Sequence, residues 1–135
     1  MSTRPFDDER VAAAFQGYAP EVRPGLLSLR ELIFNTADEL DIVATEALRW
    51  GQPAYLTREG TTVRLHSQGA HHLGIYVHCQ TTLIPTLRAR FGDELTFEGT
   101  RGIALDPHHP LDRPVLTECV AMALTYKLRR RKRGS

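Results

Sequence analysis

The stretch TTVRLHSQGAHHLGIYVH, residues 61–78, decides the fold. Val63 and Leu65 alternate with polar residues, and the same alternation returns over residues 73–78 after a link that contains a glycine. Such alternation is typical of β-strands that bury one face and expose the other. These residues therefore predict a β-hairpin with one buried face and one face in contact with water.

The register of this hairpin follows from its apolar residues, which must share the buried face. That condition pairs Leu65 with Leu73 and leaves a five-residue loop, Ser67 to His71. It also places His66 opposite His72 on the wet face, where the side chains start about 5 Å apart. Two imidazoles at that separation could bind one transition metal, iron or zinc, although no third ligand is evident. A solvated pair of histidines is the alternative interpretation.

The rest of the chain combines helical periodicity with further short strands. The expected order is helices, a run of strands, a helix, two strands and a last helix. This order predicts an α+β domain, in which an antiparallel sheet of five to six short strands has its helices packed on one face. The first half of the chain is expected to form a helix from Asp7 and Asp8 to about Gly17, a helix from about Glu21 with Val22, Leu26, Leu29 and Ile33 on its core face, and strands between Glu46 and Val77. A helix over 82–92, with Pro85 near its start, and strands over 95–99 and 101–105 should follow. Asp112 and Pro114 open the last expected helix, whose apolar stripe is Val115, Cys119, Met122 and Tyr126.

Length and charge indicate one domain with a basic end. The 135 residues fit a single unit, with a core over 20–126 and a basic tail over 127–135. The tail holds six of the seventeen basic residues, so the remaining 126 residues have eleven basic and sixteen acidic residues, a net charge of −5. A body of that sign repels a phosphate backbone, and contact with nucleic acid is expected only through the tail.

Neither a targeting segment nor a membrane span is expected. The start, MSTRPFDDER, lacks the basic and apolar regions of a signal peptide, and no stretch approaches the roughly 18 apolar residues of a membrane helix. We therefore expect a cytoplasmic protein without a membrane partner. The sequence does not indicate an oligomeric state.

The stretch EALRWGQPAY, residues 46–55, contains the single tryptophan of the chain at a turn. Either Trp50 and Pro53 pack the turn, with Gly51 supplying a conformation that other residues resist, or the tryptophan lines a pocket for a small molecule. In the second interpretation aromatic side chains near the sheet's wet face surround a ligand, and two arginines contact an anionic group. The candidate ligand-binding residues are Trp50, Pro53, Tyr55, Arg64, Tyr76 and Arg101.

Signals of catalysis are absent from the sequence. It contains no GxSxG, HExxH or P-loop motif, and no GxGxxG follows a strand. Cys79 continues the apolar face of its strand and should point inward, and Cys119 lies on an apolar helix face, so both are expected to be buried thiols. The chain is therefore expected not to be an enzyme.

Four segments resemble, in order, the domain of unknown function 1801, or YdhG-like, family over residues 20–130: LSLRELI, EALRWGQPAY, HHLGIYVH and RGIALDPHHPLDRPVL. The most specific motifs are Glu46 four positions before Trp50, the Trp50-Gly51-x-Pro53 turn, and His72 at the start of a strand. The family often has a lysine before that histidine, where this chain has Ala70 and His71. The resemblance implies a mostly unassigned role, and in one branch a frataxin-like iron chaperone.

These observations predict a non-enzymatic binding module that holds a small molecule or a metal ion near the aromatic and histidine face of its sheet. The alternative is an accessory domain that contacts nucleic acid or protein through its basic C-terminal helix. An iron site of the frataxin kind needs a cluster of acids on a helix and a sheet edge. The acids Asp38, Glu39, Asp41 and Glu46 are too few and too scattered for one.

Overall fold

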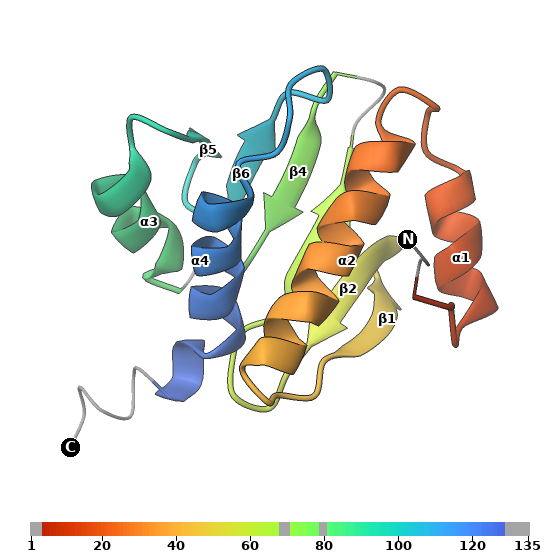
Figure 1. The fold of residues 1–135 in the computed structure, drawn as a ribbon, viewed down its shortest axis with the longest axis horizontal. Helices are drawn as coiled ribbons and strands as arrows, with labels where there is room; N and C mark the ends of the chain where they lie inside the picture. The colour runs from red at the N-terminus through yellow and green to blue at the C-terminus, as the bar shows by residue number, and fades with distance from the viewer. Residues whose placement is uncertain (1–3, 68–70, 79–80, 129–135) are drawn as a thin grey trace.

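A computed structural model describes residues 4–67, 71–78 and 81–128. In this part of the chain six strands form one antiparallel sheet in the order β1-β2-β3-β4-β6-β5, and helices cover one of its faces (Figure 1). The expected α+β architecture is therefore confirmed. The elements are α1 Glu9–Gln16, α2 Arg23–Glu39, β1 Thr45–Arg49, β2 Gln52–Leu56, β3 Val63–His66, β4 Leu73–Tyr76, α3 Leu83–Phe91, β5 Thr96–Glu98, β6 Gly102–Leu105 and α4 Arg113–Leu124.

The hairpin of β3 and β4 forms where the alternation predicted it, but its register was predicted wrongly. Leu65 pairs with Ile75 and not with Leu73, so His66 faces Gly74 and lies two residues away from its expected partner. Both registers keep the apolar side chains on the buried face, because side chains on a strand repeat every two residues. The alternation therefore fixes the faces of the strands and leaves their relative position open to a slip of two.

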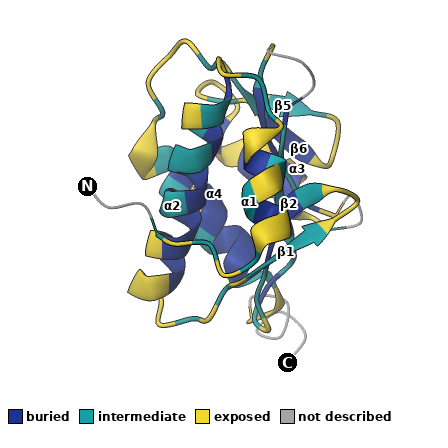
Figure 2. Ribbon diagram, turned by 90° about the vertical axis from the view of Figure 1, so that its right-hand side faces the viewer, coloured by how far each residue is buried: buried dark blue, intermediate teal, exposed yellow. Residues whose placement is uncertain are grey.

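The core lies between the sheet and the helices, and buried residues line the facing sides of these two layers (Figure 2). The carboxylate of Asp8 caps α1 by accepting from the backbone N–H of Arg10. The four apolar residues expected on the core face of α2 are all fully buried: Val22, Leu26, Leu29 and Ile33. No helix in the described ranges is both long and apolar enough to cross a bilayer.

The last helix agrees with the sequence only in part. Asp112 caps α4 by accepting from the backbone N–H of Val115 at 3.3 Å, and Cys119 and Met122 are buried as expected. Tyr126, the last member of the predicted stripe, lies beyond the end of the helix at Leu124. The helix therefore ends before its stripe does, although Val115 and Tyr126 are partly buried and pack against the core as expected.

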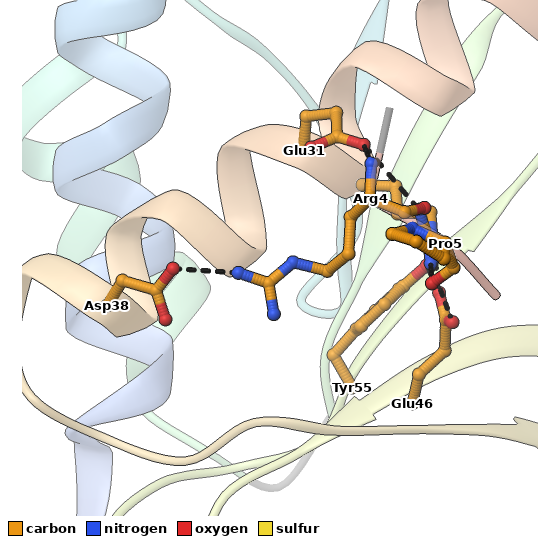
Figure 3. A network of polar contacts seen from close by, with 7 residues as sticks. Arg4, Pro5, Glu31, Asp38, Glu46 and Tyr55 are labelled. Carbon is orange, nitrogen blue, oxygen red and sulfur yellow. Dashed lines mark hydrogen bonds and ion pairs between the residues drawn. The ribbon is translucent and has the colours of Figure 1, made fainter. Parts of the chain in front are cut away.

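A buried cation ties the N-terminal segment to the rest of the fold (Figure 3). Arg30 of α2 has no exposed surface and donates from Nε and Nη2 to the carboxylate of Glu46, at 2.6 and 3.1 Å. Its other N–H groups donate to the backbone carbonyls of Arg4 and Pro5, and the hydroxyl of Tyr55 donates to Glu46 at 2.9 Å. The Arg30–Glu46 pair thereby joins α2, β1, β2 and the chain before α1.

Candidate functional site

The face of the sheet opposite the helices carries a row of polar side chains on neighbouring strands. Arg64 of β3 lies opposite Tyr76 of β4, Tyr76 lies opposite Gly102 of β6, and Gly102 lies opposite Glu98 of β5. Side chains around this row enclose a polar pocket of about 210 Å³. We call it the anion pocket, and its lining residues are Gln52, Arg64, His66, His72, Tyr76, Glu98 and Arg101.

Two glycines make room for the ring of Tyr76 on this face. A Cβ atom at Gly74 would lie 2.2 Å from Cε2 of Tyr76, and one at Gly102 would lie 2.6 Å from its Cδ1. Real Cβ atoms do not approach other atoms so closely, so the ring takes the space that side chains at these two positions would fill. The glycines therefore set the position of the Tyr76 hydroxyl.

That hydroxyl belongs to a short chain of polar contacts. It donates to Oε2 of Glu98 at 2.9 Å, while Nε2 of His72 lies 2.8 Å from Oε1 of the same carboxylate. Nε2 of His72 also lies 3.3 Å from the tyrosine oxygen. Burial, followed by the neighbouring carboxylate, raises the pKa of Tyr76 to about 12, so the hydroxyl keeps its proton at neutral pH.

His66 contacts a tyrosine that lies outside the sheet. Its Nδ1 lies 3.0 Å from the hydroxyl of Tyr18, which follows α1, and the two rings meet edge to face. Burial, then the positive charge of Arg64, then His72 lower the pKa of His66 below that of an exposed histidine. The imidazole therefore favours its neutral form at neutral pH.

The positive charge of the pocket comes from Arg64 and Arg101. Nη1 of Arg64 donates to the amide oxygen of Gln52 at 2.8 Å. Its guanidinium lies over the ring of Trp50, 4.8 Å from the centroid, and 5.9 Å from that of Tyr76. Burial, then the charge of Arg101, lower the pKa of Arg64. Within the described residues neither arginine has a carboxylate at ion-pair distance.

Trp50 does not pack into the core, since 81% of its surface is exposed. Trp50 and Gly51 form the two-residue turn between β1 and β2, and their φ angles of 53° and 73° are both positive, as in a type I′ turn. Such turns favour Asn-Gly, and a bulky residue in the left-handed region costs of order 1–3 kcal/mol. The turn thus holds a large side chain in the solvent at an energetic cost.

The structure brings together most of the predicted site residues, and five of them line the anion pocket: Arg64, His66, His72, Tyr76 and Arg101. Trp50 lies next to these residues, because the guanidinium of Arg64 packs over its ring. Tyr55 and Pro53, in contrast, do not belong to the wet face, because Tyr55 pairs with the core residue Val63 and is fully buried. The stretch QPAYL lacks the alternation that would have revealed this orientation.

Sequence reasoning missed three residues that contact the site: Gln52, Glu98 and Tyr18. Gln52 is adjacent to the predicted Pro53 on β2, and Glu98 pairs with Gly102, the residue after the predicted Arg101, so the strand pairing would have found them. Tyr18 comes from a distant loop and left no local signal. The described residues hold no group of three His, Cys, Asp or Glu side chains suited to a metal, and the predicted His66 and His72 contact Tyr18 and Glu98 respectively.

No family model and no curated protein matches this sequence. A comparison with solved structures finds the crystal structure of a protein from the DUF1801 family, YdhG of Bacillus subtilis, with a TM-score of 0.69. The match covers 89% of this chain and 92% of that one, at 16% sequence identity. This chain has the fold of a DUF1801 protein. At that identity the likeness concerns the fold alone.

The DUF1801 motifs quoted from the sequence occupy two places in this fold. Glu46 is the buried partner of Arg30, so it stabilises the chain away from the pocket. Trp50 and Gly51 form the exposed turn, and His72 lines the anion pocket. The DUF1801 resemblance thus joins two motif residues on the core side, Glu46 and Pro53, to three at or near the outer face, Trp50, Gly51 and His72.

Proposed function

We propose that this chain is a non-enzymatic binding module that holds a small anionic ligand, through a phosphate or carboxylate group, on the outer face of its sheet. The observation that carries this proposal is the presence of Arg64 and Arg101 in one pocket without a carboxylate at ion-pair distance among the described residues. Guanidinium groups bind phosphate and carboxylate oxygens with paired, charge-assisted hydrogen bonds. The proposal includes membership of the DUF1801 family, which the shared fold supports.

The acid of the pocket does not neutralise both arginines. Glu98 is the single carboxylate among the lining residues that the structure describes, and it contacts His72 and Tyr76. Two permanent positive charges therefore face one negative charge that is already hydrogen-bonded. Because of this excess of positive charge, the pocket favours anions over cations such as iron or zinc.

A binding role rather than an enzymatic one is supported by the state of Cys119. Burial raises the pKa of this thiol to about 12, so it remains protonated at neutral pH and is a poor nucleophile. The other cysteine, Cys79, lies outside the described residues. The alternative role through the basic segment 127–135 stays a prediction, because most of that segment also lies outside them. The cytoplasmic location stays a prediction as well.

Calorimetry with inorganic phosphate tests the proposal. We expect saturable binding that weakens about tenfold or more in Arg64→Gln and in Arg101→Gln, because each change removes a charge-assisted contact. Arg113→Gln, which removes the same charge at the exposed start of α4, is the matched control and should bind like the unmodified chain. Equal affinity in all four proteins, or no binding at all, would contradict the proposal.

A further inference from the structure

A second hollow adjoins the anion pocket and shares Arg64 with it. Its volume is about 760 Å³, within the range of roughly 300–1,000 Å³ typical of small-molecule sites. Trp50 lines it from the turn after β1, and Tyr126 and Lys127 line it from the chain after α4. The two hollows therefore form one surface on either side of Arg64, and we call the larger one the aromatic hollow.

Hydrogen bonds between the β2–β3 loop and the end of α4 build this hollow. The backbone N–H of Thr61 donates to the carbonyl of Ala123 at 3.0 Å, and that of Lys127 donates to the carbonyl of Glu59 at 2.8 Å. A Cβ atom at Gly60 would lie 2.2 Å from the carbonyl oxygen of Ala123, so the close approach needs a glycine. The lining of the aromatic hollow is thus held in place without a ligand.

Tyr126 is fixed in the same way. Its hydroxyl accepts a hydrogen bond from the backbone N–H of Thr82, just before α3, at 3.0 Å. The ring therefore bridges the chain after α4 and the start of α3, and it lines the hollow as Trp50 does. Two aromatic side chains on a preformed hollow suit a flat, partly apolar group.

The positive charge of the aromatic hollow favours a ligand that also carries a negatively charged group. Arg49, Arg64 and Lys127 line it, and no carboxylate does so among the described residues. Yet the body of the chain before Lys127 is acidic overall, with a net charge of −5 from eleven basic and sixteen acidic residues. A local positive surface on an acidic body attracts compact anions and repels long phosphate backbones.

We infer that the ligand is an aromatic anion, whose planar ring stacks on Trp50 in the aromatic hollow while its phosphate or carboxylate binds Arg64 and Arg101. This inference rests on the proposed function and adds the class of ligand. The indole of Trp50 is large and exposed, and its residue has a strained turn conformation. Strain of this kind is often found at ligand-binding sites, which supports a role for the indole as a stacking surface. The Arg64 guanidinium already lies over this ring and links the two parts of the site.

Three probes separate the ring from the anion: adenosine 5′-monophosphate, ribose 5-phosphate, which lacks the base, and adenosine, which lacks the phosphate. Calorimetry should give an affinity for adenosine 5′-monophosphate about tenfold higher than for ribose 5-phosphate, the usual worth of one stacked base. Trp50→Asn suits the turn and removes the ring, so it should reduce the first affinity to the level of the second. Val43→Asn, at an equally exposed apolar residue, should change neither.

The outcomes distinguish this inference from the proposed function. Ribose 5-phosphate that binds through Arg64 and Arg101, with no gain from the base, overturns the inference and leaves the anion pocket standing. No binding of any phosphate probe overturns both. A single-stranded oligonucleotide that binds more tightly than adenosine 5′-monophosphate, and loses its affinity when the chain is truncated after Leu128, replaces the inference with nucleic-acid binding through the tail.

Discussion

The position of a single ring determines the geometry of the anion pocket. Tyr76 lies over Gly74 and Gly102, and its hydroxyl contacts Glu98, which also contacts His72. Any side chain at either glycine must push the ring away. The two glycines are therefore part of the site, although neither offers a group that could contact a ligand.

Substitution of Gly74 by Ala should damage both stability and binding. The added methyl group displaces the Tyr76 ring, and overpacking of this kind costs about 1–3 kcal/mol. Chemical denaturation should show that loss, with weaker phosphate binding by calorimetry. In a Tyr76→Ala background the cost of Gly74→Ala should disappear. Gly17→Ala is the control, since the carbonyl oxygen of Ala14 would lie 3.4 Å from its added Cβ atom, and equal effects at both glycines would refute the explanation.

His66 should make the fold sensitive to acid. Burial, together with Arg64 and His72, lowers its pKa in the folded chain below the value of about 6.5 for an unfolded histidine. The unfolded chain therefore binds more protons, and the free energy of unfolding falls as the pH drops below about 6.5. Urea midpoints at pH 7.5 and 5.5 should differ less in His66→Gln than in the unmodified chain. An identical difference in both would show that His66 is not responsible.

At the scale of the elements, the turn between β1 and β2 departs most from ordinary sequence preferences. A two-residue turn with positive φ at both positions favours Asn before Gly, and this chain has Trp50 there. The substitution Trp50→Asn should raise the free energy of unfolding by up to about 1 kcal/mol, because asparagine tolerates this conformation and little packing is lost. Denaturation curves check this, and a loss of 3 kcal/mol or more would mean that the indole braces the fold.

The elements also show what the sequence could and could not predict. Their order and caps were predictable, and so were the buried faces of β3 and α2, because alternation over Val63 and Leu65 and the helical spacing of Leu26 and Leu29 report burial directly. The β3–β4 register was not, because a slip of two residues keeps every side chain on its face and no short turn motif sets the loop length.

Five of the seven lining residues of the anion pocket were predictable, but its contacts were not. Polar residues on adjacent strands share the wet face in either of the two registers that bury the apolar residues, so Arg64, Tyr76 and the histidines could be grouped from sequence alone. The contacts of Tyr18 with His66 and of Arg30 with Glu46 join distant parts of the chain. Such pairs leave no pattern in a single sequence, so the burial of Glu46 against Arg30 could not be predicted.

At the scale of the whole molecule, the Arg30–Glu46 pair should dominate the response to substitution. Glu46→Leu removes the closest carboxylate of the buried guanidinium and leaves it the longer contact with Glu31, at 3.5 Å, so this change should cost about 3–5 kcal/mol. Replacing the cluster together, as Arg30→Met, Glu46→Leu and Tyr55→Phe, should cost less than Glu46→Leu alone, because no buried charge or hydroxyl is then left unpaired.

Denaturation midpoints of these variants test that order of stabilities. The exposed pair of Arg4 and Asp38 supplies the control, and Asp38→Asn should cost about 1 kcal/mol or less because water screens that contact. A triple variant that is less stable than Glu46→Leu would mean that the ion pair itself, and not the avoidance of an unpaired charge, stabilises this part of the molecule.

The ring of Tyr76 over two glycines also supplies a built-in spectroscopic reporter. The magnetic field of an aromatic ring current falls off within a few ångströms, and the space over the Gly74 and Gly102 α-carbons is occupied by this ring. Their α-proton resonances should therefore be displaced from ordinary glycine values in the nuclear magnetic resonance spectrum. If the proposed anion enters the pocket and tilts the ring, both resonances should move together, so that its binding could be followed at the two glycines.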